Sequence, residues 1–145
     1  MQEKKIVLVV NGPNLNMLGK RPKDHYGTKT LDEICSMMKD YDIFNYDFFQ
    51  SNHEGAIIDR IQKLDYDAII INAGAYTHTS VAIHDALEIF NGPKVEVHLS
   101  DVDNREDFRK VNFIRSVCDI TITNLKENGY IEAIKYLEKW FNSLE

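Results

Sequence analysis

Apolar positions along this chain follow two alternating patterns. Short runs at 5–10 and 68–71 are almost wholly apolar and rich in β-branched residues. Such runs predict strands that are buried on both faces of a sheet. After Thr30 the apolar residues recur at helical spacing, and Thr30 with Glu33 fits a capping box, so we expect a helix to begin there.

The remaining elements are expected to alternate in the same way. We predict further strands at 45–50, 94–98 and 120–123, helices at 54–64, 80–90 and 130–141, and a short helix from Arg105. Ser51 and Asn52 are candidates to cap the helix at 54–64, and 11–27 is expected to be a long irregular loop. Five strand–helix units predict an α/β fold: a single flavodoxin-like domain over 1–145. Its five-stranded parallel sheet would be doubly wound, with helices on both faces, whereas a barrel needs about eight units.

Charge and cysteine content narrow the class of protein. The formal net charge of −6 argues against nonspecific binding to nucleic acid or to anionic membranes. Cys35 and Cys118 lie far apart and form no CxxC pair, which is typical of reduced thiols in a cytoplasmic protein. The first apolar run is too short for a signal peptide, and no apolar stretch is long enough to span a membrane.

Candidate chemistry gathers in three loops. In open α/β sheets, ligands bind beyond the carboxyl ends of the strands, which here are followed by loops 11–27, 72–80 and 98–105. These loops hold polar residues suited to a site: Asn14, Arg21, Tyr26, Asn72, Thr77, His78, His98 and Ser100. Neither GxGxxG nor GxxxxGK[ST] is present, which argues against a dinucleotide site and against a P-loop. The helix that begins near Ser80 offers free N–H groups to a carboxylate, and Arg21 and Arg109 offer positive charge, so we expect a small anionic substrate.

Two residues are candidates for acid–base chemistry. Glu96 and His98 are two apart on a predicted strand and therefore share a face, where the carboxylate would orient a general acid. Alternatively, Glu96 is an exposed residue of an edge strand. Tyr26 would act as a base only if a nearby cation such as Arg21 stabilised its phenolate, because a phenol ordinarily has a pKa of about 10. Alternatively, Tyr26 only packs beneath its loop.

Several motifs resemble, in order, those of the type II dehydroquinases. They are NGPNLNMLG (11–19) with Arg21 and Tyr26, QSNHEG (50–55), NAGAYTHTSVAIHDAL (72–87), VEVHLS (95–100) and REDFR (105–109). The resemblance covers nearly the whole chain. It implies a flavodoxin-like subunit that assembles as a homododecamer, a tetramer of trimers. It also implies a 3-dehydroquinate dehydratase of the shikimate pathway that needs no metal or cofactor and forms 3-dehydroshikimate by anti elimination through an enolate.

The resemblance also implies roles for individual residues. Tyr26 would be the base, with Arg21 stabilising its phenolate, and Asn14 would hold a water against the enolate oxygen. His98 would protonate the departing hydroxyl, oriented by Glu96. Asp85 would reach into the site of a neighbouring subunit. The other substrate-binding residues would be Asn72, His78, Leu99, Ser100 and Arg109, with Leu99 and Ser100 acting through their backbone N–H groups.

Some positions depart from the family pattern and keep other interpretations open. Pro22 directly follows Arg21, His84 stands where Arg is usual, Asp101 and Asp103 replace Asn and His, and the segment 110–117 is atypical. These changes are expected to affect subunit contacts and affinity more than mechanism. One alternative is a hydrolase with a divalent-metal site at His98, Asp101 and Asp103. Another is an inactive binding or scaffold protein on the same fold.

Overall fold

The computed structural model describes residues 3–144 and contains one five-stranded sheet in the order β2-β1-β3-β4-β5, with all paired strands parallel. The strands are β1 (Ile6–Asn11), β2 (Asn45–Gln50), β3 (Ala68–Asn72), β4 (Lys94–Val97) and β5 (Ile120–Ile122). The predicted α/β fold and its five strands are confirmed, and every strand bound agrees to within one residue.

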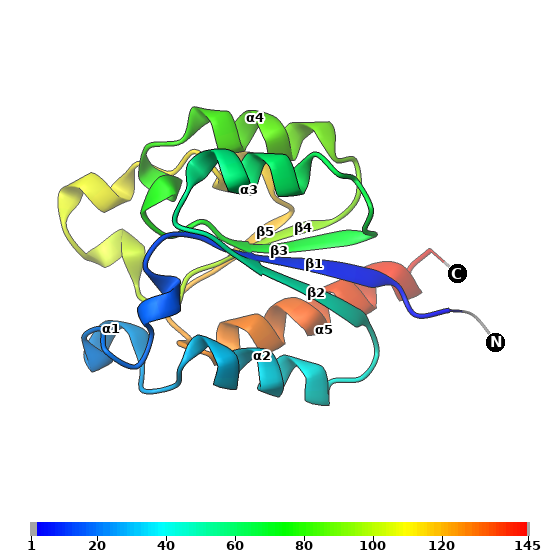
Figure 1. The fold of residues 1–145 in the computed structure, drawn as a ribbon, viewed down its shortest axis with the longest axis horizontal. Coiled ribbons are helices and arrows are strands. Elements are labelled where there is room, and N and C mark those ends of the chain that lie inside the picture. Colours follow the sequence, from blue (N-terminus) through cyan, green and yellow to red (C-terminus); the bar gives the residue numbers. More distant parts are fainter. Residues whose placement is uncertain (1–2, 145) are drawn as a thin grey trace.

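Helices cover both faces of the sheet (Figure 1). The helices α2 (Leu31–Asp40) and α5 (Asn128–Asn142) lie on one face, and α3 (Glu54–Ile61) and α4 (Val81–Ile89) lie on the other. Alternate residues of β1 supply two separate cores: Val7 and Val9 pack toward α2 and α5, and Leu8 and Val10 toward α3 and α4. This two-sided burial explains why the strand sequence is apolar at nearly every position.

The order of the strands reverses between β1 and β3. The chain first moves outward from β1 to β2 and then crosses back to β3, so their carboxyl ends form the crevice in which open α/β sheets bind ligands. Asn11 is in register with Asn72 there, and the Gly12 amide donates to the Asn72 carbonyl at 2.8 Å. A Cβ on Gly12 would lie 2.4 Å from the Ala73 carbonyl oxygen, so only glycine permits this close approach of the two loops.

Two predictions for the α3 region are wrong. The helix ends at Ile61 rather than at residue 64, because Leu64 takes a left-handed conformation with φ 52° and the Tyr66 hydroxyl donates to the Ile61 carbonyl at 2.5 Å. Its N-cap is His53, with no side-chain cap. Ser51 Oγ instead accepts from the His53 amide at 2.9 Å, and Asn52 Oδ1 accepts from the Asn14 amide at 3.0 Å.

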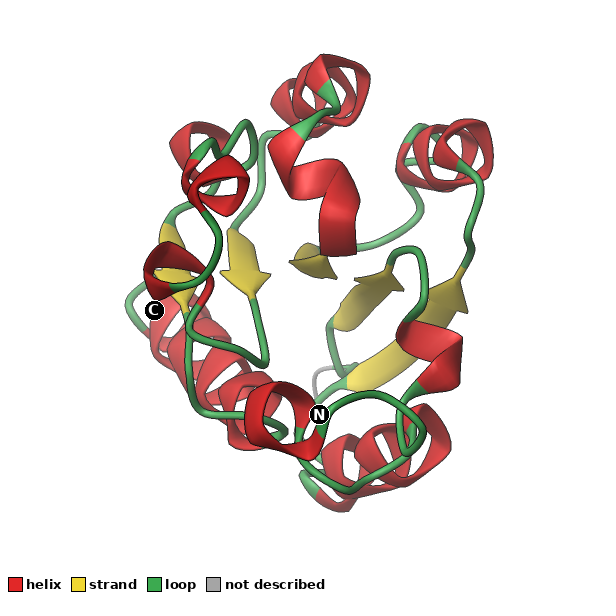
Figure 2. Cartoon of the chain, turned by 90° about the vertical axis from the view of Figure 1, so that its left-hand side faces the viewer, coloured by secondary structure: helices red, strands yellow, loops and turns green. Residues whose placement is uncertain are grey.

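The loops at the carboxyl ends are more structured than predicted. The segment 11–27 contains a 3-10 turn at Leu15–Met17 and the short helix α1 (Lys23–Tyr26). The single short helix expected from Arg105 is replaced by 3-10 turns at Val102–Asn104, Asp107–Lys110 and Arg115–Val117. Figure 2 views the molecule from the side of the carboxyl ends of the strands, with short helical turns around them. Within 3–144, no helix is both long and apolar enough to cross a membrane.

Candidate active site

A cavity of 110 Å³ lies at the carboxyl ends of β1, β3 and β4, where the three predicted loops meet. It is lined by Pro13, Asn14, Leu15, Arg21, Tyr26, Asn72, Gly74, Ala75, His78, His98, Leu99, Ser100, Val102, Arg105 and Arg109. Nine residues predicted for the site from the sequence are among them. Glu96 lies behind His98, and Asp85 does not line the cavity. Residues far apart in the sequence therefore meet where the topology of the sheet predicts a site.

Tyr26 lies between two guanidinium groups at the wall of this cavity. The Arg21 Cζ atom lies 3.7 Å from the centroid of the Tyr26 ring, and Arg105 Nη1 donates to the phenol oxygen at 2.7 Å. The same Nη1 donates to Ser100 Oγ at 3.1 Å. The side chain is 8% exposed and faces the cavity, so it does more than pack beneath its loop. Two guanidinium groups therefore contact this phenol, one over its ring and one at its oxygen.

Three arginines contribute to this cavity. Burial is the largest cause that lowers the pKa of Arg21; Tyr26 opposes the shift, and the charges of Arg105 and Arg109 add to it. Arg109 Nε donates to both carboxylate oxygens of the exposed Glu106, each at 3.2 Å. Mutual repulsion among three guanidinium groups is relieved when an anion binds between them, so the cavity is suited to a negatively charged ligand.

Glu96 and His98 form a buried pair. Glu96 is 0% exposed and lies on β4, which is flanked by β3 and β5, so the alternative of an exposed edge-strand residue is wrong. His98 Nε2 donates to Glu96 Oε2 at 2.6 Å. Burial raises the pKa of Glu96, but hydrogen bonds and charge from His98, with hydrogen bonds from Thr121 and Asn112, outweigh it and hold that pKa below the ordinary value. An ionised carboxylate here accepts from the imidazole and fixes its orientation.

His78 faces the same cavity with a defined ring orientation. Its Nδ1 donates to the Val111 carbonyl at 2.7 Å. Burial is the main cause that lowers the pKa of His78 below its usual value. Because Nδ1 carries the hydrogen, the neutral ring leaves Nε2 as an acceptor, which is suited to a substrate hydroxyl.

A buried network fixes Asn72 beneath the cavity. The Tyr130 hydroxyl donates to Asn11 Oδ1 at 2.6 Å and accepts from Asn72 Nδ2 at 3.2 Å. Asn72 Oδ1 accepts from the Gly74 amide at 3.1 Å. Burial raises the pKa of Tyr130, so this phenol stays neutral and serves as a hydrogen-bond bridge between β1 and β3.

Asn14 has an unusual backbone conformation. Its φ is 69°, in the left-handed region that non-glycine residues adopt infrequently, and its amide donates to Asn52 Oδ1. Local strain of this kind is retained where the surrounding structure holds a functional group in place. Asn52 also accepts from the Tyr76 hydroxyl through its carbonyl, at 2.6 Å, so it fixes the loop after β1 against the turn after β3.

The backbone amides at the start of α4 and those of Leu99 and Ser100 were both considered for an anion, and the structure distinguishes them. Ser80 Oγ accepts from the Ile83 amide at 2.9 Å, and the first residues of α4 do not line the cavity, so the prediction of a carboxylate site at that helix end is wrong. Leu99 and Ser100 do line it. Within residues 3–144 neither of their amides donates to a protein acceptor, and both are therefore available to an anion.

The metal site considered at His98, Asp101 and Asp103 is also wrong. His98 is bound to Glu96, Asp101 accepts from Asn104 at 2.8 Å, and Asp103 pairs with Arg115 at 3.1 Å. Among the described residues, the one group of three potential ligands close enough to share a metal is His84, Asp85 and Glu88, which lies on α4 and does not line the cavity.

Two departures from the family pattern contact the atypical segment 110–117. Asp103 pairs with Arg115, and His84 Nδ1 donates to the Phe113 carbonyl at 2.6 Å. Pro22 precedes α1 directly, where its fixed backbone suits the start of a helix. Asp103 and His84 therefore have partners within this chain.

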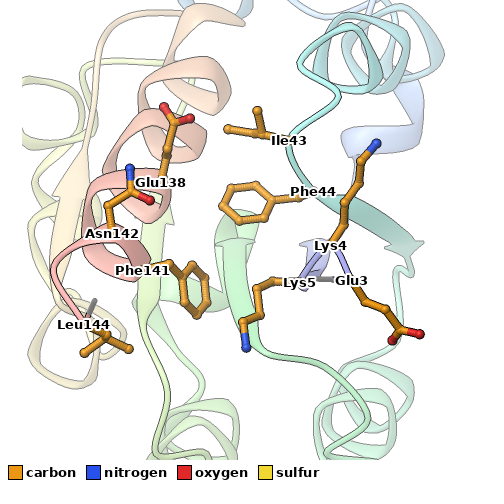
Figure 3. A pocket seen from close by; sticks show the side chains of 9 residues that line it. All are labelled: Glu3, Lys4, Lys5, Ile43, Phe44, Glu138, Phe141, Asn142 and Leu144. Atoms are coloured by element: carbon orange, nitrogen blue, oxygen red, sulfur yellow. The ribbon is translucent and has the colours of Figure 1, made fainter. Parts of the chain in front are cut away.

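A larger groove lies at the opposite end of the sheet, where β1 and β2 begin and α5 ends (Figure 3). Its volume is 410 Å³, and it is lined by Glu3, Lys4, Lys5, Ile43, Phe44, Glu138, Phe141, Asn142 and Leu144. Lys4 pairs with Asp42 at 2.5 Å, and Lys5 Nζ lies 5.8 Å from the centre of the Phe141 ring. The described lining of this groove lacks the arginines, histidines and tyrosine of the smaller cavity. We therefore assign the chemistry to the smaller cavity.

Sequence reasoning missed Arg105, Asn52, Asn112 and Thr121. Arg105 lies at the end of a loop that the topology rule had identified and is the first residue of the REDFR motif, but no role was predicted for it. The other three act through partners distant in sequence. Asn112 and Thr121 donate to Glu96 across 16 and 25 residues, and Asn52 accepts from Asn14 across 38. No local pattern predicts such contacts.

Comparisons with known proteins point to one family. A family model described as Dehydroquinase class II matches residues 5–138. A 3-dehydroquinate dehydratase of Thermotoga neapolitana is 52% identical over 136 residues, covering 92% of this chain and 94% of its own; one of Fusobacterium nucleatum is 49% identical over 144 residues, covering 94% and 98%. The crystal structure of a type II dehydroquinase from Butyrivibrio crossotus matches with a TM-score of 0.90 at 44% identity, covering 93% of this chain and 98% of that one.

Proposed function

This chain belongs to the class II dehydroquinase family, and from that premise we propose that it dehydrates 3-dehydroquinate to 3-dehydroshikimate. The predicted family and the predicted enzyme class, a hydro-lyase, are confirmed. The single observation that carries the mechanism is that one cavity is lined by both a phenol between two guanidinium groups and an imidazole bound to a buried carboxylate.

The proposed first step is removal of a proton next to the ketone. Tyr26 acts as the base in its phenolate form, which the guanidinium groups of Arg21 and Arg105 stabilise. The electrons of the C–H bond move into the ring and onto the ketone oxygen, giving an enolate. Asn14 holds a water against the enolate oxygen in this scheme. Donors placed where the negative charge develops are the large term in such a step.

The proposed second step is loss of the hydroxyl group from the opposite face. The enolate collapses to the conjugated ketone and the C–O bond breaks, while His98 gives its proton to the departing oxygen, which leaves as water. General acid catalysis of this kind contributes roughly 10²- to 10⁴-fold. Glu96 orients the ring through Nε2, so Nδ1 is the atom left to serve the substrate. Neither step uses a metal or a cofactor.

We assign substrate binding to the remaining groups of the cavity. The carboxylate of 3-dehydroquinate would accept from the free amides of Leu99 and Ser100, near the positive charge of Arg109. Asn72 and His78 would bind ring hydroxyls, since both side chains line the cavity and are fixed by partners behind it. Positioning by several polar groups at once lowers the entropic part of the barrier.

We further propose that the active form is a homododecamer in which Asp85 enters the site of a neighbouring subunit. Asp85 is exposed on α4 and lies outside the cavity of its own chain. A carboxylate from a neighbour would meet the three arginines of the site and offset part of their charge. The reaction would then serve the shikimate pathway in the cytoplasm.

The decisive experiment mixes purified protein with 3-dehydroquinate in the presence of EDTA and follows ultraviolet absorbance of the conjugated ketone. We expect turnover by the wild type and a loss of at least about 10³-fold in kcat for both Tyr26→Phe and His98→Ala. Tyr136→Phe, a half-buried residue of α5 that does not line the cavity, is the matched control and should keep full activity. A folded wild type without turnover would refute the proposal and favour the binding-protein alternative.

A further inference from the structure

The buried Glu96 carboxylate is held by three donors that divide unequally between its two oxygens. Thr121 Oγ1 donates to Oε1 at 2.6 Å. Oε2 accepts from both His98 Nε2 at 2.6 Å and Asn112 Nδ2 at 2.9 Å. Asn112 therefore shares its acceptor atom with the proposed acid, whereas Thr121 occupies the other end of the carboxylate.

The orientation of the Asn112 amide is fixed by its other contacts. Its Oδ1 accepts from the amides of Ile114 at 2.7 Å and Arg115 at 2.9 Å. Because an amide oxygen accepts and an amide nitrogen donates, these two bonds leave Nδ2 directed at Glu96.

The backbone on either side of Asn112 is bound to the turn that carries His78. The Val111 carbonyl accepts from His78 Nδ1 at 2.7 Å, and the Phe113 amide donates to the Thr77 carbonyl at 2.9 Å. The segment 111–113 thus connects both imidazoles of the cavity, and Asn112 is the residue of the segment that reaches Glu96.

We propose that Asn112 is a positioning residue that fixes the imidazole of His98 through Glu96. The Asn112 amide donates to one lone pair of Glu96 Oε2, so His98 Nε2 is left with the other lone pair. The direction of that lone pair then sets the orientation of the imidazole ring. A neutral amide brings no charge of its own, so Glu96 keeps its negative charge beside the imidazole. The kinetic part of this inference rests on the proposed function.

The sharpest variant is Asn112→Asp, which has nearly the same shape. It keeps an oxygen to accept from Ile114 and Arg115 but removes the donor to Glu96. We expect kcat to fall about 10- to 100-fold while KM changes less than about threefold, because misplacement of a catalytic group lowers the rate more than affinity. The deficit should shrink as the pH falls, since a protonated carboxyl donates as the amide does. Glu96 also interacts electrostatically with His78 and Cys118. The pH profile of kcat is therefore interpreted with these two groups included.

The matched control is Thr121→Val, which removes a donor from the same carboxylate but from the oxygen that does not bind His98. We expect it to change kcat less than about threefold. Equal losses in the two variants would mean that only the total number of donors on Glu96 matters and would overturn the proposal. A folded Asn112→Asp protein with wild-type kcat at every pH would overturn it as well.

A second readout does not depend on turnover. Long-range ¹H–¹⁵N NMR spectra report the ring nitrogens of His98 directly. We expect their chemical shifts to change in Asn112→Asp and to stay near wild type in Thr121→Val; unchanged shifts in both would refute the positioning role. If Asn112→Asp does not fold, Asn112→Ser, whose hydroxyl is too short to reach Glu96 in the same way, carries the same comparison. A wild type that fails to convert 3-dehydroquinate yet shows this NMR difference would refute the proposed function alone.

Discussion

The two ends of the sheet differ in how their cavities are built. The cavity at the carboxyl ends has a volume of 110 Å³, and that at the amino ends has 410 Å³. The smaller one is lined by three arginines, two histidines and a buried tyrosine, while the larger is lined by charged side chains and apolar residues near the chain ends (Figure 3). Volume therefore does not identify the site. The convergence of fixed polar groups at the topological switch point does.

The carboxyl-end cavity is also where the protein tolerates imperfect burial. Thr77 Oγ1 and Arg105 Nε are buried without a hydrogen-bond partner in residues 3–144. A buried polar group without a partner destabilises a protein by roughly 1–3 kcal/mol. Asn14 adds a left-handed backbone conformation at the same end of the sheet, as expected where geometry serves chemistry rather than stability.

Among the tests of how the two ends of the sheet differ, replacing Arg105 with lysine should give the largest loss of kcat. Arg105→Lys keeps the charge, but a single ammonium group does not reproduce the planar contact in which Nη1 reaches both Tyr26 and Ser100. We expect kcat to fall about 10²-fold. Arg115→Lys, on the exposed pair with Asp103, is the control and should stay within about twofold. Wild-type activity in Arg105→Lys would remove the second cation from the mechanism.

Asp85→Asn tests whether the cavity is completed by a neighbouring subunit. If Asp85 contributes to a neighbour's site, kcat/KM should fall about tenfold, which corresponds to about 1.4 kcal/mol, while the mass of the assembly in light scattering is unchanged. Glu88→Gln, one turn further along the exposed face of α4, is the control. Unchanged kinetics in Asp85→Asn would exclude this residue from the site.

The pH dependence of the free energy of unfolding should distinguish the buried acid at the carboxyl end of the sheet from an exposed acid at the amino end. The pKa of Glu96 is held below its ordinary value of 4.5, so its contribution to folding is present above that value and is lost as the pH falls through the folded pKa. In Glu96→Gln, denaturant melts should show a flatter acid limb, by at most about 1.4 kcal/mol per pH unit. Glu138→Gln, in the exposed amino-end groove, should keep the wild-type slope. Parallel curves for wild type and Glu96→Gln would contradict the pairing.

The smallest effect on activity is expected in the larger groove itself. Phe44 is 6% exposed and packs edge-on against Phe141, with ring centroids 5.8 Å apart. Phe44→Leu should lower the free energy of unfolding by about 1–2 kcal/mol through lost packing but leave kcat/KM within about twofold. A large loss of activity in a well-folded Phe44→Leu protein would show that the two ends of the sheet are coupled.

Local patterns were sufficient for the strands and for most helices. Strand bounds follow from apolar runs that two helical layers bury, and the capping box at Thr30 is present as predicted. The helix end at Ile61 was missed because the hydroxyl of Tyr66, in the next loop, takes the carbonyl there. The turns between 98 and 117 were missed because they have no periodic pattern and are held by contacts to other loops.

The sequence by itself determined the order of strands and helices, the three loops that carry the site, and nine of the residues that line it, because periodicity and sheet topology are local or nearly local properties. Only the tertiary structure decided the partners. Arg105 reaches Tyr26 across 79 residues, Tyr130 reaches Asn11 across 119, and Asn112 shares Glu96 with His98. Contacts of this kind depend on how distant loops pack around the end of the sheet, and no pattern within a single segment contains that information.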